Sequence, residues 1–334
     1  MRSILLGPIL RIAVKFSTAP DRKRIFDALS KLKSKLEQSS DGNAVIEFDI
    51  DAGRYILFSD QHKGARNGAD DFAAAEPNYL EALAYYDRQA FHLISLGDAE
   101  ELWENTLSQV QEHNKASFAA ERKFIVRSAF TKIFGNHDLD WQINPLARIE
   151  LKSMYGKSVA VKEGIILRTR VNGKIISIFC THGHQGDSQS DGNFFSKFIV
   201  SNIWAPLQAY LRINPNTPAH NTTFKTAHNT IMYEWSSLQH DLILITGHTH
   251  QPVFESLTHL ERIKWQQNQG DQVSPNIKPG YFNTGCCCFD DGDITGIEIV
   301  DGSMHLVKWE SVDGIPSRQV LETSSLVILA TLLT

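Results

Sequence analysis

The sequence predicts an α/β protein built on mixed β-sheets, and two observations support that prediction. The first half of the chain alternates apolar strand-like runs with amphipathic helical stretches, whereas the second half is rich in strands. The 334 residues are 42% hydrophobic and 21% charged, which is ordinary for a globular protein with a large buried core. This length suits one large α/β domain or two small ones.

The first half supplies the alternation of helix and strand. Apolar residues at helical spacing between charges predict a helix over residues 21–37, at Ile25, Leu29, Leu32 and Leu36. Strand-like runs follow at 45–50 and 55–60, joined by a turn at 51–54. Further helices are expected at about 78–91 and 106–128, each leading into a strand, at 92–98 and 132–138. The strands of the second half are expected at 164–170, 174–183, 242–250, 281–289, 294–300 and 304–309.

These elements suggest three regions. We expect an N-terminal helical extension over 1–44, a main domain over 45–310 and a C-terminal tail over 311–334. An insertion at about 188–240 interrupts the late strands, and its apolar residues, among them Phe198 and Trp204, recur at helical spacing. That stripe either packs onto the core or forms a lid that binds an acyl or aryl group of a substrate.

Charge and cysteine content restrict the partners and the compartment. A net charge of −5 gives no basic footprint, so we expect no nucleic-acid partner. Cys286, Cys287 and Cys288 are adjacent and lack a second spaced pair, which favours buried reduced thiols over a thiolate metal site. We expect a cytoplasmic protein. The apolar run at 3–10 is too short to span a bilayer and leaves peripheral membrane contact open.

Five of the strand-like runs end in Asp, Asn or His. Functional sites assemble at the carboxyl ends of strands in sheets with strand–helix connections. Each motif alone is ordinary turn chemistry, but five in succession indicate a site. The candidate ligands are Asp60, His62, Asp98, Asn136, His182, His248 and His250.

This mixture of imidazole, carboxylate and amide donors indicates a transition-metal centre. Such a set suits manganese, iron, cobalt, nickel or zinc better than magnesium or calcium. Seven ligands are too many for one ion with an open position, and they suit two ions about 3.5–4 Å apart that share a carboxylate. Asp98 is the candidate for the shared carboxylate.

The motifs D-x-H, GD-x-x-E, GNHD, HGH and GHTH occur in this order between about 55 and 300. As a set they resemble those of the calcineurin-like metallophosphoesterase superfamily. The resemblance implies a four-layer α/β/β/α sandwich, in which two mixed sheets pack face to face with helices outside. It assigns Asp60, His62, Asp98 and His250 to a first ion, and Asp98, Asn136, His182 and His248 to a second. It makes His137 the acid beside the scissile phosphate and Asp138 the residue that orients it.

The expected activity is metal-dependent hydrolysis of a small phosphoester, by a phosphodiesterase or phosphatase that uses two divalent ions, with manganese the leading candidate. A hydroxide bridging the ions would attack phosphorus, and His137 would give a proton or a hydrogen bond to the leaving oxygen. Two other classes, a non-catalytic metal-binding scaffold and a nuclease, stay open. The acidic charge weakens the nuclease alternative.

One branch of the superfamily, the UDP-2,3-diacylglucosamine pyrophosphohydrolases, is the most similar. LGDAEELWE at 96–104 resembles its signature, and the insertion lies where that branch has its lipid-handling cap. The chain departs from the branch at His137, where an arginine is usual. We therefore expect general phosphoester cleavage, and hydrolysis of a lipid-linked nucleotide is the alternative.

Four residues are candidates for substrate contacts. Lys63 and Arg66 either contact phosphate or are solvated loop charges. Phe198 and Trp204 would bind a hydrophobic group of the substrate if the insertion is a lid. His184 and Asp187 are expected to lie outside the ligand set.

Overall fold

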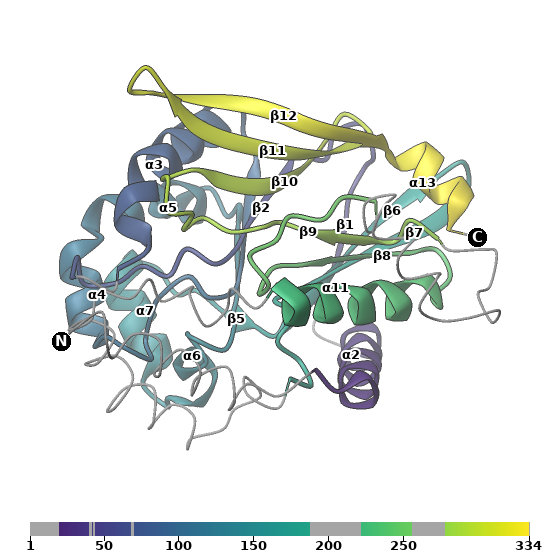
Figure 1. Cartoon of the computed structure of the whole chain (residues 1–334), viewed down its shortest axis with the longest axis horizontal. Coiled ribbons are helices and arrows are strands. Elements are labelled where there is room, and N and C mark those ends of the chain that lie inside the picture. The colour runs from purple at the N-terminus through teal and green to yellow at the C-terminus, as the bar shows by residue number, and fades with distance from the viewer. Residues whose placement is uncertain are drawn as a thin grey trace.

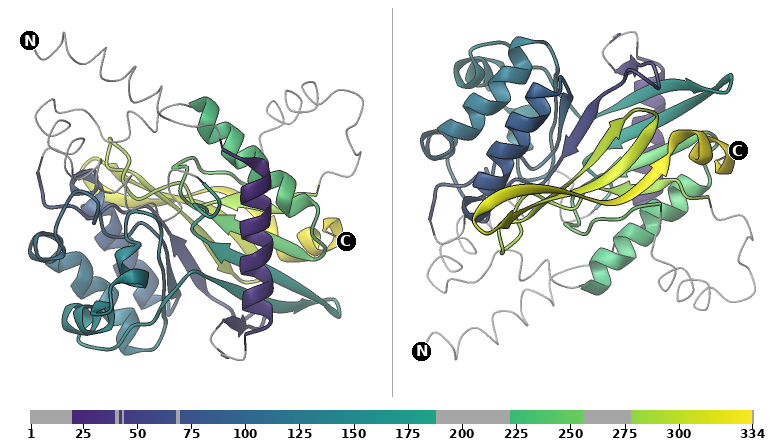
Figure 2. Two further views of the ribbon diagram at one scale, coloured as in Figure 1. Left: turned by 90° about the horizontal axis from the view of Figure 1, so that it is seen from below. Right: turned by 90° about the horizontal axis from the view of Figure 1, so that it is seen from above.

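The computed structural model describes residues 20–39, 42, 44–67, 70–187, 222–255 and 278–333. Within them two β-sheets pack face to face, and helices cover the outer face of each sheet (Figures 1 and 2). One sheet has five strands in the order β1-β6-β7-β8-β9, and the other has seven in the order β12-β11-β10-β2-β3-β4-β5. This arrangement confirms the predicted four-layer α/β/β/α sandwich.

The five-stranded sheet is mixed. Its strands are β1 (Val45–Glu47), β6 (Gly164–Val171), β7 (Lys174–Thr181), β8 (Leu242–Thr246) and β9 (Tyr281–Asn283). β6 and β7 form an antiparallel pair, whereas β7, β8 and β9 run parallel to one another. The carboxyl ends of these three strands therefore meet at one edge.

Two helices, α2 (Arg22–Glu37) and α11 (Thr222–Ser237), cover the outer face of this sheet. The side chain of Asp21 accepts a hydrogen bond from Arg24 N and caps α2. The predicted apolar stripe of α2 is buried against the sheet and α11, which contributes Met232 and Trp235 to the same cluster. The N-terminal extension expected over 1–44 is thus, from α2 onward, a packed layer of the domain.

The seven-stranded sheet holds β12 (Ile315–Ser325), β11 (Ser303–Val312), β10 (Ile294–Val300), β2 (Tyr55–Phe58), β3 (His92–Leu96), β4 (Phe130–Ile133) and β5 (Val161–Lys162). Strands β2 to β5 are parallel, and β10 to β12 are antiparallel. The helices α3 (Phe72–Arg88) and α5 (Lys115–Val126) cover its outer face. The shorter α4 (Leu107–His113), α6 (Asp140–Ile143) and α7 (Ala147–Tyr155) pack with α5 in a separate cluster beside β5.

The position of β2 explains why its sequence is continuously apolar. All four of its side chains are buried, because the strand lies in the middle of the sandwich. Tyr55 and Leu57 enter the core between the two sheets, whereas Ile56 and Phe58 pack under α3. Each such side chain stabilises the fold by roughly 1.5–3 kcal/mol, so the segment that carries the first motif is held firmly from both faces.

Two predicted boundaries are wrong. The C-terminal tail expected over 311–334 forms β12 and α13 (Leu326–Leu332), and Leu326 and Leu329 enter the core between the sheets. The insertion expected at 188–240 ends too late, because α11 packs on the sheet as part of the core. Residues 188–221 lie outside the described part of the chain. No helix among the described residues is long and apolar enough to cross a membrane.

Candidate metal centre

The loops that follow five parallel strands bring the candidate ligands together. β2, β3 and β4 are neighbours in one sheet, and β7 and β8 are neighbours in the other. Their carboxyl ends carry Asp60 and His62, Asp98, Asn136, His182, and His248 and His250, respectively. All but the last two histidines are buried, and those two are partly buried. The sequence argument from strand ends therefore holds for the positions of these side chains.

The first group lies around His250. Its Nε2 atom is 3.2 Å from Asp60 Oδ1 and 3.3 Å from His62 Nε2. His62 Nε2 is 3.9 Å from Asp98 Oδ2. Atoms that bind one ion at about 2.0–2.2 Å are separated from one another by such distances. These four residues are the set that the resemblance assigns to the first ion.

The second group shares Asp98 with the first. Asp98 Oδ2 lies 3.0 Å from His182 Nε2, and the ligand atoms of Asp98, His182 and His248 lie within 4.8 Å of one another. Asp98 also forms a group with Asp60 and His62. Its carboxylate thus belongs to both groups of ligand atoms.

Three buried atoms in this centre make no hydrogen bond to any described residue: Asp60 Oδ1, Asn136 Oδ1 and His182 Nε2. Buried polar atoms are normally paired, because an unpaired one costs about 1–3 kcal/mol. All three belong to the expected ligand set and carry a lone pair that a cation can accept. The residues therefore fit a divalent metal ion.

In the two buried imidazole ligands, His62 and His182, the ring nitrogen that faces away from the centre has a partner of its own. His62 Nδ1 lies 2.8 Å from Glu101 Oε2, and His182 Nδ1 lies 2.9 Å from the carbonyl oxygen of Leu96. Each acceptor favours the tautomer that has its proton on Nδ1, which leaves the Nε2 lone pair toward the centre. Histidine ligands of metal ions are usually held in this way.

The backbone at the centre is unusual. Five of the candidate ligands have φ between +49° and +69°, a region that residues other than glycine rarely occupy: Asp60, His62, Asp98, His248 and His250. Such conformations cost of order 1–3 kcal/mol each and cluster at functional sites. In TGHTH they turn the chain between the two histidines, so that His248 faces His182 and His250 faces His62.

His137 lies beside this centre, with 27% of its side chain exposed. Its Nδ1 atom is 2.7 Å from Glu101 Oε2, and its ring stacks on Trp103 at a centroid distance of 4.4 Å. Trp103 Nε1 donates a hydrogen bond of 2.6 Å to the carbonyl oxygen of Asn136. Glu101 and Trp103 belong to LGDAEELWE, the segment whose resemblance to the branch signature was the only signal for them.

The orienting role expected for Asp138 is wrong in this structure. Its two carboxylate oxygens accept hydrogen bonds from the backbone N–H groups of Gly135 and Ala99, at 2.6 and 3.0 Å. Burial raises the pKa of Asp138 to about 6. The positive charge of Lys132 acts against this rise, whereas the negative charges of Glu100 and Asp98 add to it. Asp138 therefore ties the GNHD loop to the loop after β3, and Glu101 is the carboxylate that contacts His137.

The electrostatics of the centre are dominated by close carboxylate–imidazole pairs. Burial alone would raise the pKa of Asp98, but the neighbouring imidazoles of His182, His137 and His62 hold it well below its ordinary value. Burial alone would lower the pKa of His182, but the carboxylates of Asp98 and Asp60 raise it to about 9. The negative and positive groups of the centre are therefore mutually stabilised.

Both interpretations of Lys63 are wrong. Its side chain is fully buried, and its Nζ atom lies 2.6 Å from Glu121 Oε1 and 3.6 Å from Glu100 Oε1. Lys63 is thus neither a phosphate contact nor a solvated loop charge. Arg66 is paired with Glu76 and also donates to Asn114 Oδ1 at 3.3 Å, so its guanidinium is held by α3 and the α4–α5 junction.

The remaining predicted positions divide into two sets. His184 is buried beside His182, and Asp187 Oδ2 lies 3.6 Å from His248 Nε2, so both lie around the ligand set. Phe198 and Trp204, expected to contact the substrate, lie outside the described residues. The lid interpretation of the insertion stays a prediction.

Comparisons with known proteins add little to this picture. The chain matches no family model, and a search of curated proteins finds no significant match. A single mutant of Vps29 from Entamoeba histolytica is similar in structure with a TM-score of 0.33 and 14% identity, over 80% of this chain and 98% of that one. Vacuolar Protein Sorting 29 from Cryptosporidium parvum gives 0.35 and 13%, over 82% and 98%. Likeness at this level carries no weight for the function of this chain.

Proposed function

We propose that this chain is a phosphoester hydrolase of the calcineurin-like metallophosphoesterase superfamily that works with two divalent metal ions. The observation that carries the proposal is that seven candidate ligand side chains from five strand ends come together, and that three of them, Asp60, Asn136 and His182, each present a buried atom without a hydrogen bond. A purely structural polar cluster would satisfy those atoms within the protein.

In the proposed enzyme Asp60, His62, Asp98 and His250 hold one ion, and Asp98, Asn136, His182 and His248 hold the other. Manganese is the leading candidate, and iron, zinc, cobalt or nickel would suit the same donors. When bound, the two ions supply Lewis acidity toward the phosphoryl oxygens and lower the pKa of water.

The chain's own contribution to proton transfer comes from His137. Because Nδ1 faces Glu101, Nε2 is the atom available to donate a proton to the leaving oxygen. The stacked Trp103 ring fixes the imidazole plane, and the Glu101 carboxylate lies beside Nδ1.

The substrate class follows from His137 and from the ligand set. An imidazole at this position supports general cleavage of phosphodiesters or phosphomonoesters over hydrolysis of a lipid-linked nucleotide. The alternative of a non-catalytic scaffold is disfavoured because every ligand position carries a metal-binding side chain. A small phosphoester, with or without a hydrophobic group, is the proposed partner.

A panel of chromogenic substrates tests this proposal. With manganese supplied, the purified chain is expected to hydrolyse p-nitrophenyl phosphate, bis-p-nitrophenyl phosphate or both, and His182→Ala is expected to abolish turnover. Plasmid DNA and a nucleoside diphosphate-linked lipid in the same assay test the two alternative activities. Binding of ions without hydrolysis of any member of the panel would favour the scaffold.

A further inference from the structure

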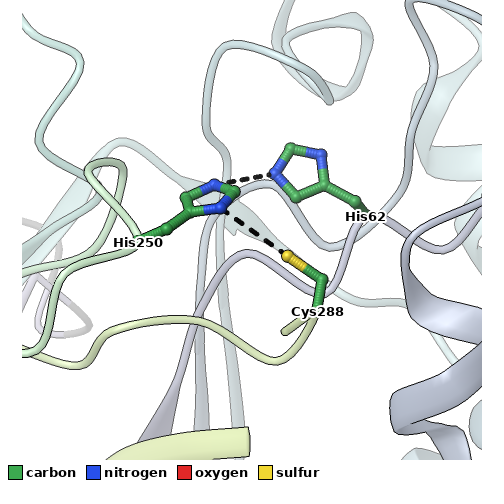
Figure 3. Close-up of side chains that lie close together, drawn as sticks. All are labelled: His62, His250 and Cys288. Carbon is green, nitrogen blue, oxygen red and sulfur yellow. Dashed lines mark hydrogen bonds between the residues drawn. The ribbon is translucent and has the colours of Figure 1, made fainter. Parts of the chain in front are cut away.

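The thiol of Cys288 contacts the nitrogen of His250 that faces away from the candidate metal centre (Figure 3). Cys288 Sγ lies 3.7 Å from His250 Nδ1, whereas Nε2 of the same ring lies 3.3 Å from His62 Nε2. The sulfur thus lies at Nδ1 of the ring and His62 at Nε2, and the ligand atoms of all three residues lie within 4.8 Å of one another. Cys288 is 1% exposed, so bulk water does not compete for this contact.

The backbone explains why a cysteine reaches this position. β9 is parallel to β8, so the loop after β9, which carries the three cysteines, lies beside the loop that carries His250. Cys287 N donates hydrogen bonds to the carbonyl oxygens of Ser59 and Asp60, at 3.1 and 3.2 Å. The cysteine loop is thus attached directly to the first motif. The Cys287 side chain enters the core under α3, so adjacent cysteines serve different purposes.

Three imidazoles of the centre, those of the buried His62 and His182 and of the partly buried His250, show a common pattern. The Nδ1 atom of His62 has a carboxylate partner, and that of His182 has a backbone carbonyl. These are the usual partners of histidine ligands in metal sites. For His250 the corresponding partner is a sulfur.

We propose that Cys288 is the positioning residue of His250, and that it accepts a hydrogen bond from Nδ1–H and so directs the Nε2 lone pair toward the first ion. This inference rests on the proposed metal centre. Because sulfur is a weak acceptor, the contact orients the ring and selects its tautomer with less added basicity than the carboxylate gives His62. The thiol thereby sets the affinity of one ion and leaves the other unaffected.

Zinc binding to the full chain tests this role. We would measure both zinc dissociation constants by chelator competition in the wild type, Cys288→Ala, Cys288→Ser and Cys287→Ala. Loss of an outer partner typically weakens a metal site by about 10–100-fold, so C288A is expected to weaken one ion at least about tenfold. C288S is expected to restore most of that loss, because a hydroxyl also accepts from Nδ1–H. C287A removes an equally buried thiol and is expected to change stability without changing either constant.

A ¹⁵N-edited NMR spectrum of the zinc-loaded chain supplies a readout that does not depend on affinity or folding of C288A. The Nδ1–H signal of His250 is expected in the wild type and is expected to shift in C288S, because oxygen replaces sulfur. An unshifted signal, unchanged zinc constants in C288A, or a C288S variant as weak as C288A would overturn the inference. If these measurements succeed while no phosphoester is cleaved, the proposed hydrolase activity fails and the role of Cys288 stands.

Discussion

Glu101 Oε2 lies 2.7 Å from Nδ1 of His137, on the side of the imidazole that faces away from the exposed surface of the site. The same oxygen lies 2.8 Å from Nδ1 of His62, a candidate ligand of the first ion. One carboxylate thus connects the proposed acid with the proposed metal centre. Removal of the Glu101 charge is therefore expected to lower both the rate of catalysis and the affinity for metal.

Substitution of His137 is expected to separate chemistry from metal binding. His137→Ala should retain both ions, because His137 belongs to neither ligand group. Its kcat should fall by about 10²–10⁴, the usual contribution of a positioned acid. The loss should be smaller for p-nitrophenyl than for alkyl leaving groups, which need more protonation. Equal losses for both substrates in steady-state assays would show that His137 is not the acid.

Substitution of Glu101 is expected to affect both processes. Glu101→Gln removes the charge that holds His62 and His137 while preserving the size of the side chain. The affinity for one ion should fall by roughly 10-fold or more, and kcat at saturating metal should fall as well. Trp103→Phe is the control that keeps the Glu101 charge: it changes the stacking on His137 and removes the hydrogen bond to the Asn136 carbonyl oxygen, but it should leave the affinity of the ion held by His62 unchanged. A normal metal titration of E101Q would contradict the shared role.

The site could be predicted from sequence where each residue directly follows an apolar strand, as Asp60 and His250 do. The buried position of Lys63 cannot be predicted from sequence, because its partner Glu121 comes from α5 and the sequence does not reveal that pairing. The β11–β12 hairpin is not predicted because consecutive residues of β12, Gln319 to Thr323, are exposed, so the strand lacks the alternation of apolar and polar residues that marks a half-buried strand. Its signal was the Asp313–Gly314 pair, whose positive φ angles of 50° and 79° form the tight turn.

Substitution of Lys63 is expected to affect the stability of the fold and not the binding of substrate. Lys63→Met leaves Glu121 as a buried carboxylate without its ammonium partner, so the free energy of unfolding should fall by about 3–5 kcal/mol. The KM of the folded enzyme for a small phosphoester should not change. Arg66→Met, which breaks a more exposed pair with Glu76, should cost about 1 kcal/mol or less. Denaturant titration compares the stabilities of the two variants. A raised KM with unchanged stability in K63M would instead support a contact between Lys63 and the phosphate of the substrate.

His92, the first residue of β3, predicts a pH dependence of stability. Burial, then the positive charges of Arg127 and Lys162, lower its pKa to about 4. The folded protein therefore keeps His92 neutral where the unfolded chain protonates it, below about pH 6.5. The associated stability is present above that pH and is lost as the pH falls toward 4, by on the order of 2 kcal/mol.

The control for this pH dependence is His92→Gln, which can keep a hydrogen bond to Thr131 Oγ1, 2.9 Å away in the wild type. Unfolding free energies of the two proteins should converge or cross as the pH is lowered from 7 to 4. Parallel curves over that range would mean that the imidazole titrates normally in the folded state.

The most direct measurement of the central claim is the number of metal ions bound per chain, by elemental analysis of protein equilibrated with manganese or zinc and freed of excess metal. The ligand groups around Asp98 predict two ions in the wild type, and one or none in Asp98→Asn, which loses the shared carboxylate. A wild-type chain that binds no ion, or an Asp98→Asn chain that still binds two with unchanged affinity, would contradict the dinuclear centre.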